Sequence, residues 1–118
     1  MKKDKDNLIV VKSMDFAIRC VKLNEYLVKE KSEYTMSKQL FRSGTSIGAN
    51  IKEAIRGQSK SDFAAKMNIA LKEASETEYW IELLRNTDYI TDAQSENLLT
   101  DCVELIKMLT SIVKTAFK

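Results

Sequence analysis

The scarcity of helix-breaking residues is the feature that most constrains this chain. Its 118 residues contain no proline and only three glycines, whereas strand boundaries and tight turns rely on both residue types. The rest of the sequence is rich in lysine, glutamate, leucine, isoleucine and alanine. Because 44% of the residues are hydrophobic and 31% are charged, the chain can bury one core beneath a charged surface. The sequence therefore predicts an all-α domain.

Apolar residues recur at spacings of three and four over four long segments, which is the period of one helix face. Short connectors separate the segments and force successive helices to lie antiparallel. We predict an antiparallel up-down-up-down four-helix bundle over residues 8–118, a single domain that follows a flexible tail at residues 1–7. The predicted helices run over residues 8–31, from a connector at 32–36 to a carboxyl cap at Gly57, from an amino cap at Ser59 to about Asn86, and from an amino cap at Thr91 to the carboxyl terminus.

Two of these helix starts carry capping patterns. Asp62 follows Ser59 by three residues, and Gln94 follows Thr91 by three, which is the spacing of a capping box. The apolar period also predicts which side chains face the core. These are Val10, Met14, Ala17, Val21 and Val28 with Phe16, Cys20, Leu23 and Leu27 in the first helix; Leu40, Gly44, Ile47, Ile51 and Ala54 in the second; Phe63, Met67, Ala70, Ala74, Thr77, Ile81 and Leu84 in the third; and Leu99, Cys102, Ile106, Leu109, Val113 and Ala116 in the fourth.

Gly44 and Gly48 lie one turn apart on the inward side of the second predicted helix. A glycine inside a helix costs roughly 1 kcal/mol relative to alanine. Close packing of another helix backbone can offset that cost, and a contact between subunits is the alternative explanation. The same spacing promotes helix pairing in membranes, but the charged residues of this helix exclude that setting.

A row of cations faces away from the predicted core on the second helix: Lys38, Arg42, Lys52 and Arg56. Residues 34–58 hold four basic residues and one acidic residue, although the net charge of the chain is only +2. Such a row is either a solvated helix face or a track for nucleic-acid phosphates, which cations one or two turns apart can contact in succession. The lysines of the tail could extend the track: Lys2, Lys3 and Lys5.

Two more stripes lie outside the predicted apolar seam. On the second helix a polar stripe flanks the seam, and we expect its side chains to be partly buried and hydrogen-bonded: Ser43, Ser46, Asn50 and Glu53. On the third helix large apolar residues lie opposite the core stripe: Ile69, Tyr79, Trp80 and Leu83. Aromatic residues rimmed by charges are typical of interfaces, so we expect the protein to form a homo-oligomer through this face.

Nothing in the sequence indicates catalysis. Histidine, which general acid–base and metal chemistry use most, is absent. The acidic pairs Glu73 with Glu76 and Glu78 with Glu82 have the spacing of a solvated or salt-bridged helix face. No glycine begins a phosphate-binding loop that ends in Lys-Ser or Lys-Thr. We expect no enzymatic activity, no cofactor and no metal site.

The two cysteines and the hydropathy indicate a cytoplasmic protein. Cys20 and Cys102 lack metal or redox spacing, so we expect both to be buried in the core as small hydrophobic residues. The amino-terminal segment MKKDKDN has no apolar stretch and cannot act as a signal peptide. Charged residues interrupt the most apolar region, residues 98–117, well short of the roughly 20 apolar residues that span a bilayer. We therefore predict no contact with a membrane.

Three stretches of the second and third helices resemble a known family: QLFRSGTSIGANIKEA, SKSDF and IALKEASETEYWIELL. They are similar to the four-helix-bundle proteins encoded in intervening sequences of bacterial 23S ribosomal RNA. The similarity covers nearly the whole chain. Ala54 stands where many members have glycine, and Thr35 where a proline often stands. The residues that carry the resemblance are Arg42, Ser43, Ser46, Asn50, Ile51, Glu53, Phe63, Ala70, Glu78 and Leu83.

The resemblance implies an up-down bundle that assembles into a homopentamer. One relative, the accessory protein of diversity-generating retroelements, is a pentamer whose basic surface engages nucleic acid and a reverse transcriptase. The sequence thus favours a non-enzymatic oligomer that binds RNA or DNA without base specificity through the cations of the second helix. The alternative is a symmetric scaffold that binds a protein partner. A third hypothesis places a small-molecule site at Arg42, Asn50 and Glu53.

Overall fold

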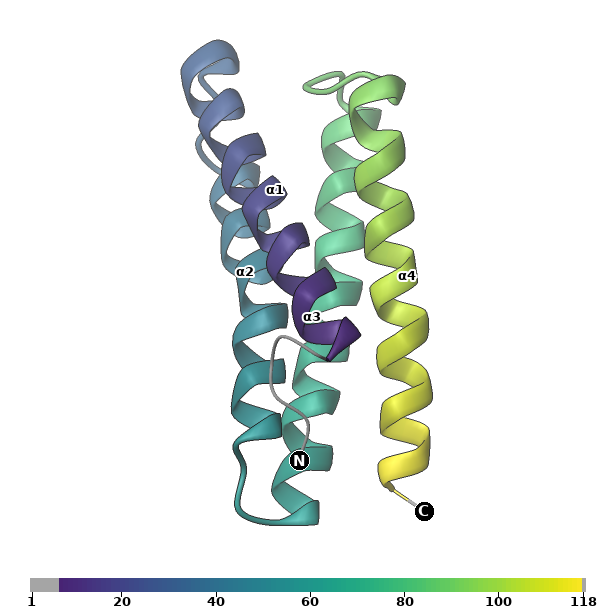
Figure 1. Cartoon of the computed structure of the whole chain (residues 1–118). Coiled ribbons are helices and arrows are strands. Elements are labelled where there is room, and N and C mark those ends of the chain that lie inside the picture. The colour runs from purple at the N-terminus through teal and green to yellow at the C-terminus, as the bar shows by residue number, and fades with distance from the viewer. Residues whose placement is uncertain (1–6, 118) are drawn as a thin grey trace.

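The computed structural model describes residues 7–117 and contains four helices over that range: α1 (Leu8–Lys31), α2 (Met36–Ile55), α3 (Lys60–Asn86) and α4 (Asp92–Ala116). Successive helices run in opposite directions along the long axis of the molecule (Figure 1). This arrangement confirms the predicted all-α antiparallel four-helix bundle. Of the tail predicted at residues 1–7, residues 1–6 lie outside the described part of the chain. Asn7 caps α1, because its side-chain oxygen accepts a hydrogen bond from the Ile9 N–H at 3.2 Å.

Both predicted capping patterns are present. The Ser59 hydroxyl accepts a hydrogen bond from the Asp62 N–H at 3.0 Å at the start of α3. At the start of α4, the Thr91 hydroxyl accepts from the Gln94 N–H at 3.1 Å, while the Gln94 side chain accepts from the Thr91 N–H at 2.8 Å. These bonds satisfy backbone N–H groups that have no partner within the helix. The local sequence therefore sets both helix starts.

The start of α2 is capped by a side chain of the preceding connector. The carboxylate of Glu33 accepts hydrogen bonds from the backbone N–H groups of Thr35, Met36 and Ser37 at 3.2, 3.2 and 2.7 Å. The Thr35 side chain makes no capping bond. The Glu33 carboxylate also lies where the helix dipole favours negative charge. The predicted connector at residues 32–36 is therefore one residue too long, because Met36 is already helical.

Gly57 lies just beyond α2, where a carboxyl cap was expected, but it lacks the left-handed conformation typical of such caps. Its N–H donates to the Ala54 carbonyl at 3.1 Å. A Cβ at this position would collide with the carboxylate of Asp62. The first turn of α3 therefore approaches Gly57 closely, and a larger residue here would require the Asp62 side chain to move.

The core-facing stripes of α2 and α3 agree with the sequence. All five predicted inward residues of α2 are buried. On α3, the predicted residues are buried except Phe63, which is half-buried against the core. Thr77 is the one polar member of this stripe and is fully buried.

The apolar residues of α1 form two adjacent stripes, and only one of them fills the core. Phe16, Cys20 and Leu27 are fully buried, and Leu23 packs against the core. The expectation that Met14 faces inward is wrong, because its side chain is 52% exposed. The rest of that second set is mixed: Val10 is buried, while Ala17, Val21 and Val28 are half-buried.

The core stripe of α4 is also rotated from the predicted one. Leu98 and Leu105 are buried together with Cys102 and Leu109. Adjacent residues in a helix point about 100° apart, so a stripe through Leu98 and Leu105 faces a different direction from the predicted stripe. The predicted members Leu99, Ile106, Val113 and Ala116 are only half-buried.

Gly44 lets α1 and α2 approach closely, as the sequence predicted. A Cβ on Gly44 would lie 2.5 Å from Cys20 Sγ and 2.9 Å from Cys20 Cβ. A Cβ on Gly48 would lie 3.3 Å from Ser13 Oγ, which is a milder conflict. The two glycines are therefore packing devices within the bundle, and the first is the stricter one.

The contact between α1 and α4 is the smallest among neighbouring helices. In Figure 1 the amino-terminal end of α1 leans across the bundle, away from its far end beside α2. Two ion pairs link these helices: Lys12 Nζ lies 2.7 Å from Glu104 Oε1, and Arg19 pairs with Asp101. None of the described helices is long and apolar enough to cross a membrane.

Candidate interaction surfaces

The four cations of α2 lie on its outer face, as predicted. We call Lys38, Arg42, Lys52 and Arg56 the basic ridge. Three of them are exposed, and Lys52 is half-buried. They form two pairs, Lys38 with Arg42 and Lys52 with Arg56, and the members of each pair are four residues apart. At 1.5 Å per residue, the two ends of the ridge are about 27 Å apart.

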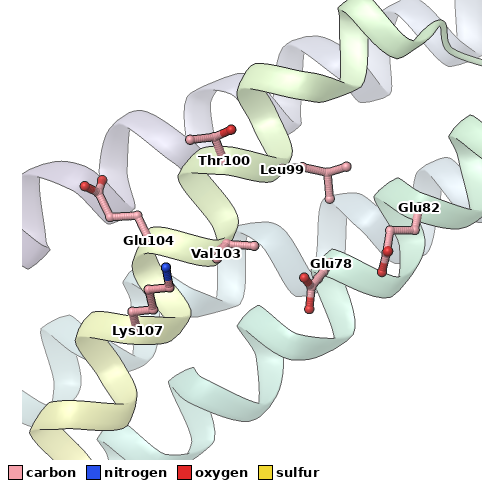
Figure 2. Close-up of a pocket in the computed structure, with 7 residues that line it drawn as sticks. All are labelled: Glu78, Glu82, Leu99, Thr100, Val103, Glu104 and Lys107. Atoms are coloured by element: carbon pink, nitrogen blue, oxygen red, sulfur yellow. The ribbon is translucent and has the colours of Figure 1, made fainter.

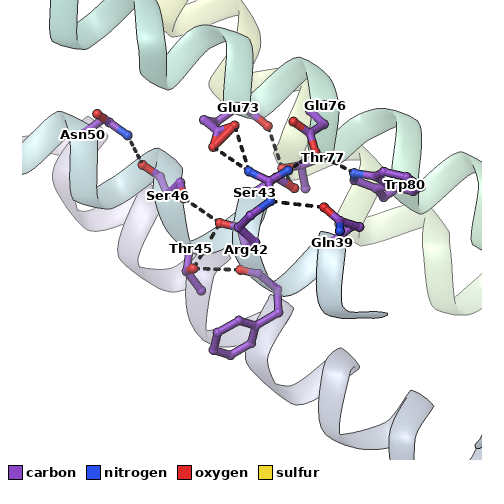
Figure 3. Close-up of polar contacts among 11 residues, drawn as sticks. Gln39, Arg42, Ser43, Thr45, Ser46, Asn50, Glu73, Glu76, Thr77 and Trp80 are labelled. Atoms are coloured by element: carbon purple, nitrogen blue, oxygen red, sulfur yellow. Dashed lines mark hydrogen bonds and ion pairs between the residues drawn. The ribbon is translucent and has the colours of Figure 1, made fainter. Parts of the chain in front are cut away.

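Arg42 is held by carboxylates of α3. Its Nη1 lies 3.3 Å from Glu73 Oε2, its Nη2 pairs with Glu76, and its Nε donates to Gln39 Oε1 at 3.2 Å. Glu76 also accepts a hydrogen bond from Trp80 Nε1 at 2.9 Å. Figure 3 shows this cluster bridging α2 and α3. The two carboxylates offset the charge of Arg42, which lowers its attraction for a phosphate.

The predicted polar stripe of α2 does not form one network. Ser43 is fully buried and accepts a hydrogen bond from Thr77 Oγ1 at 2.8 Å, which joins α2 to α3 within the core. Thr77 Oγ1 also lies 2.7 Å from the Glu73 carbonyl of its own helix. Ser43 therefore has a structural partner, in agreement with the expectation that it is hydrogen-bonded.

The other three members have separate partners. Ser46 Oγ donates to the Arg42 carbonyl at 2.6 Å, and Asn50 Nδ2 donates to the Ser46 carbonyl at 2.8 Å. Glu53 is exposed, contrary to the expected partial burial, and pairs with Lys66 at 3.0 Å. The hypothesis of a small-molecule site at Arg42, Asn50 and Glu53 thus loses its geometric basis, because the structure directs these side chains to different partners.

The predicted interface residues of α3 differ in exposure. Ile69 is 43% exposed and Tyr79 is 57% exposed. Trp80 and Leu83 are half-buried, and Trp80 packs against the core. The rings of Tyr79 and Trp80 meet edge to face with centroids 5.1 Å apart. The expectation that this set lies apart from the core is therefore wrong for Trp80, while Ile69 and Tyr79 remain on the surface.

A second exposed apolar surface lies on α1. We call Leu8, Val11, Met14 and Ile18 the α1 apolar surface, because each is at least 42% exposed. Beside it, a groove of about 260 Å³ runs between α1 and α2, and small or apolar residues line most of it. They include Val10, Met14 and Ala17 from α1 and Gly48 and Ala49 from α2, with Lys52 of the basic ridge at its edge.

An acidic groove of about 550 Å³ lies between α3 and α4. Glu78 and Glu82 of α3 border it on one side, and Leu99 and Val103 of α4 supply apolar side chains (Figure 2). Thr100, Glu104 and Lys107 complete the lining, and Glu104 is paired with Lys12 of α1. We call this feature the acidic groove. It combines a charged edge with a half-buried apolar floor.

Both cysteines are buried and reduced, as predicted. Burial raises the pKa of Cys20 to about 12. Burial, followed by the proximity of Cys20, Glu78 and Glu82, raises the pKa of Cys102. The Cys102 thiol donates to the Ala74 carbonyl at 3.3 Å. Within residues 7–117, no cluster of carboxylates and thiols has the composition of a metal site.

Comparison with known proteins identifies the family. A family model for the 23S rRNA-intervening sequence protein matches residues 5–111. The chain belongs to this family. A crystal structure of a protein of unknown function from the S23 ribosomal protein family of Bacteroides thetaiotaomicron is similar to it, with a TM-score of 0.88 and 57% sequence identity over 90% of this chain and 98% of that chain. No curated protein matches the sequence. The resemblance seen in the second and third helices is thus confirmed.

For this member of the 23S rRNA-intervening sequence protein family, sequence reasoning missed the α1 apolar surface and the acidic groove. The first was missed because only Met14 of this surface belongs to a predicted inward stripe, whereas Leu8, Val11 and Ile18 belong to neither. An apolar helix face that is wider than its contact with the neighbouring helices indicates a second binding partner. The acidic groove left a weaker signal: two glutamates four residues apart, which usually mark a solvated face.

Proposed function

We propose that this protein is a non-enzymatic scaffold that assembles with copies of itself and presents its surface to other macromolecules. The observation that carries the proposal is the pair of exposed apolar sets on different helices. On α1 these are Leu8, Val11, Met14 and Ile18, and on α3 they are Ile69 and Tyr79. Contiguous exposed apolar patches mark interaction sites more often than idle surface.

The position of the two sets supports a cyclic assembly. A ring of identical subunits with an odd number of members is built from contacts in which each subunit uses two different surfaces. Exposed apolar side chains on both α1 and α3 supply two such surfaces. The homopentamer implied by the family resemblance requires this kind of contact, and one self-complementary patch would not suffice.

The test is the molar mass in solution, measured by light scattering over a range of protein concentrations. We expect a species several times heavier than the 13.5 kDa chain. The double variant Val11→Ser/Ile18→Ser should shift the mass toward that of one chain, because it removes apolar area from α1. Tyr34→Ser is the control, since Tyr34 is even more exposed than Val11 and Ile18 but lies in the connector between α1 and α2. A wild-type protein that stays at the mass of one chain would end the proposal.

Nucleic-acid binding through the basic ridge is the second candidate function, and the alignment of four cations on one helix face favours it. Cations that neutralise phosphates release counterions, so such binding weakens steeply with salt and does not depend on base sequence. The pairing of Arg42 with Glu73 and Glu76 counts against it. The two functions are compatible only where the ridge stays accessible in the assembly.

A filter-binding measurement with structured RNA tests the second candidate. Retention at low salt that falls in Lys38→Glu/Arg56→Glu would support it. The charge-matched control is Lys22→Glu/Lys29→Glu, which changes two exposed lysines of α1. Equal retention of both variants, or no retention of the wild-type protein, would exclude the ridge as a nucleic-acid site.

A further inference from the structure

We propose that the amino-terminal half of α1 in one copy packs parallel to the middle of α3 in a second copy. In this contact Leu8 packs against Ile69. Nearly three turns further along both helices, Ile18 packs against Tyr79. The proposal rests on the proposed self-assembly and specifies its contact. The occupant of the α1 apolar surface is a second copy of this chain, because the two surfaces match in spacing, rotation and charge.

The exposed apolar residues of the two surfaces are spaced alike. Leu8 and Ile18 are ten residues apart on α1. Ile69 and Tyr79 are also ten residues apart on α3, and all four side chains are exposed. Ten residues rise by about 15 Å and produce the same rotation about either helix axis. Both apolar pairs can therefore meet in one contact between two adjacent helices.

A charged residue lies between the two apolar residues on each helix, and the two charges are opposite. Asp15 occupies this place on α1, and Lys72 occupies it on α3. Both side chains are exposed, and neither forms an ion pair with another residue that the structure describes. Lys12, about one turn before Asp15, pairs with Glu104 instead. Opposite charges flanked by apolar contacts favour the docking of these two surfaces on each other.

The fold sets the direction of the contact. Successive helices run in opposite directions, so α1 and α3 run in the same direction (Figure 1). A rotation about an axis that follows the bundle preserves this direction, so α1 of one copy meets α3 of the next copy in parallel. In the proposed register Asp15 is level with Glu76. Lys72 is then one turn away, about 6 Å along the axis, which is within the reach of a lysine side chain.

Glu76 does not oppose this register by repulsion of Asp15. Its carboxylate pairs with Arg42 and accepts a hydrogen bond from Trp80 Nε1 at 2.9 Å. The guanidinium therefore offsets the charge of Glu76. The charge of Lys72 then dominates the field that Asp15 meets on the outer face of α3.

The contact joins two different surfaces, so it is head to tail. Every copy uses its α1 surface toward one neighbour and its α3 surface toward the other, which lets the assembly close into a ring. An antiparallel contact would instead need a two-fold rotation across the bundle. That rotation would place Ile18 against Ile69, which distinguishes the two arrangements by experiment.

Cysteine cross-linking tests the register. Ile18→Cys/Tyr79→Cys should join copies into a ladder of covalent multimers on a non-reducing gel, because a disulfide needs Cα atoms within about 7 Å of each other. The native thiols are buried and should not take part. Ile18→Cys/Ile69→Cys is the matched control at the same protein concentration. Its two positions are exposed on the same surfaces but lie about 15 Å apart along the axis in the parallel register, so it should not form the ladder.

A charge swap tests the pairing of Asp15 with Lys72. Asp15→Lys and Lys72→Asp should each raise the protein concentration needed for assembly about threefold, because exposed pairs have modest effects. The variant Asp15→Lys/Lys72→Asp restores opposite charges and should recover the wild-type behaviour in light scattering. Circular dichroism of each variant verifies folding.

The outcomes separate this proposal from the proposed function. If the wild-type protein has the mass of one chain, self-assembly fails and this contact fails with it. If the wild-type protein assembles but Ile18→Cys/Tyr79→Cys forms no ladder, self-assembly stands and the contact is overturned. A ladder from Ile18→Cys/Ile69→Cys would overturn the parallel direction. A double charge variant that assembles no better than its parents would overturn the pairing of Asp15 with Lys72.

Discussion

The sulfur atom of Cys20 occupies space that a side chain on Gly44 would need. A Cβ at residue 44 would stand 2.5 Å from this sulfur, closer than real Cβ contacts come. The two residues hold α1 and α2 in contact through the centre of the bundle. The spacing between these helices therefore depends on the absence of a single methyl group.

Gly44→Ala is expected to destabilise the protein. Overpacking costs about 1–3 kcal/mol, and the better helix propensity of alanine offsets about 1 kcal/mol. We therefore expect a net loss of up to about 2 kcal/mol in the free energy of unfolding, measured by urea titration. Gly48→Ala is the control, because its Cβ would meet Ser13 Oγ at 3.3 Å. Its effect should be near zero, and equal losses for both variants would contradict the explanation.

Thr77 and Ser43 should be energetically coupled. Thr77→Val keeps the side-chain shape but leaves the buried Ser43 oxygen without this donor, which costs about 1–3 kcal/mol. Ser43→Ala/Thr77→Val should lose less than the sum of the two single variants. Thr110→Val, which removes an exposed hydroxyl bonded within its own helix, should change stability by less than about 0.5 kcal/mol. Strict additivity in the double-variant cycle would refute the coupling.

The single tryptophan reports on the Arg42 cluster. Trp80 Nε1 donates to Glu76, and Arg42 pairs with the same carboxylate. Glu76→Ala should increase the hydration of the half-buried ring and shift its fluorescence emission to longer wavelength. Glu96→Ala is the control, since it changes an exposed glutamate on α4. An unchanged emission maximum in Glu76→Ala would show that the carboxylate does not hold the ring.

The two thiols should be inert in the folded protein. The pKa of Cys20 is raised to about 12 and that of Cys102 is also raised, in both cases chiefly by burial. At pH 8 both groups are therefore protonated and poorly nucleophilic. A disulfide reagent should react within minutes only after denaturation, when it should modify both thiols of each chain. Ser75→Cys adds an exposed thiol on α3 that should react at once in the folded protein.

The sequence was sufficient to predict the helices and the core-facing residues of α2 and α3. Capping chemistry at Thr91 and Ser59 is local, so residue spacing alone predicted it. The inward face of α2 was also predictable, because its apolar residues form one narrow stripe. On α1, Met14 and Phe16 belong to two adjacent stripes, and only the positions of the other helices decide which stripe is buried. The cap by Glu33 depends on the path of a connector and leaves no simple spacing pattern.

The candidate surfaces were predictable to different degrees. The outward direction of the basic ridge follows from the helical period. The carboxylate partners of Arg42 lie on α3, 31 and 34 residues away, and periodicity carries no information about such pairs. The acidic groove is formed by two helices together, so neither helix reveals it by itself.

The seam between α1 and α4 is the weakest edge of the bundle, because these helices share the smallest contact and exposed ion pairs link them. Solvent-exposed pairs such as Lys12 with Glu104 contribute little to stability and lose strength in salt. Local opening should therefore begin with α1 swinging outward, and its amide hydrogens should exchange with deuterium before those of α3. Raising the ionic strength should widen that difference. The bundle then has three extensive contacts, between α1 and α2, α2 and α3, and α3 and α4, and one weak seam that closes it.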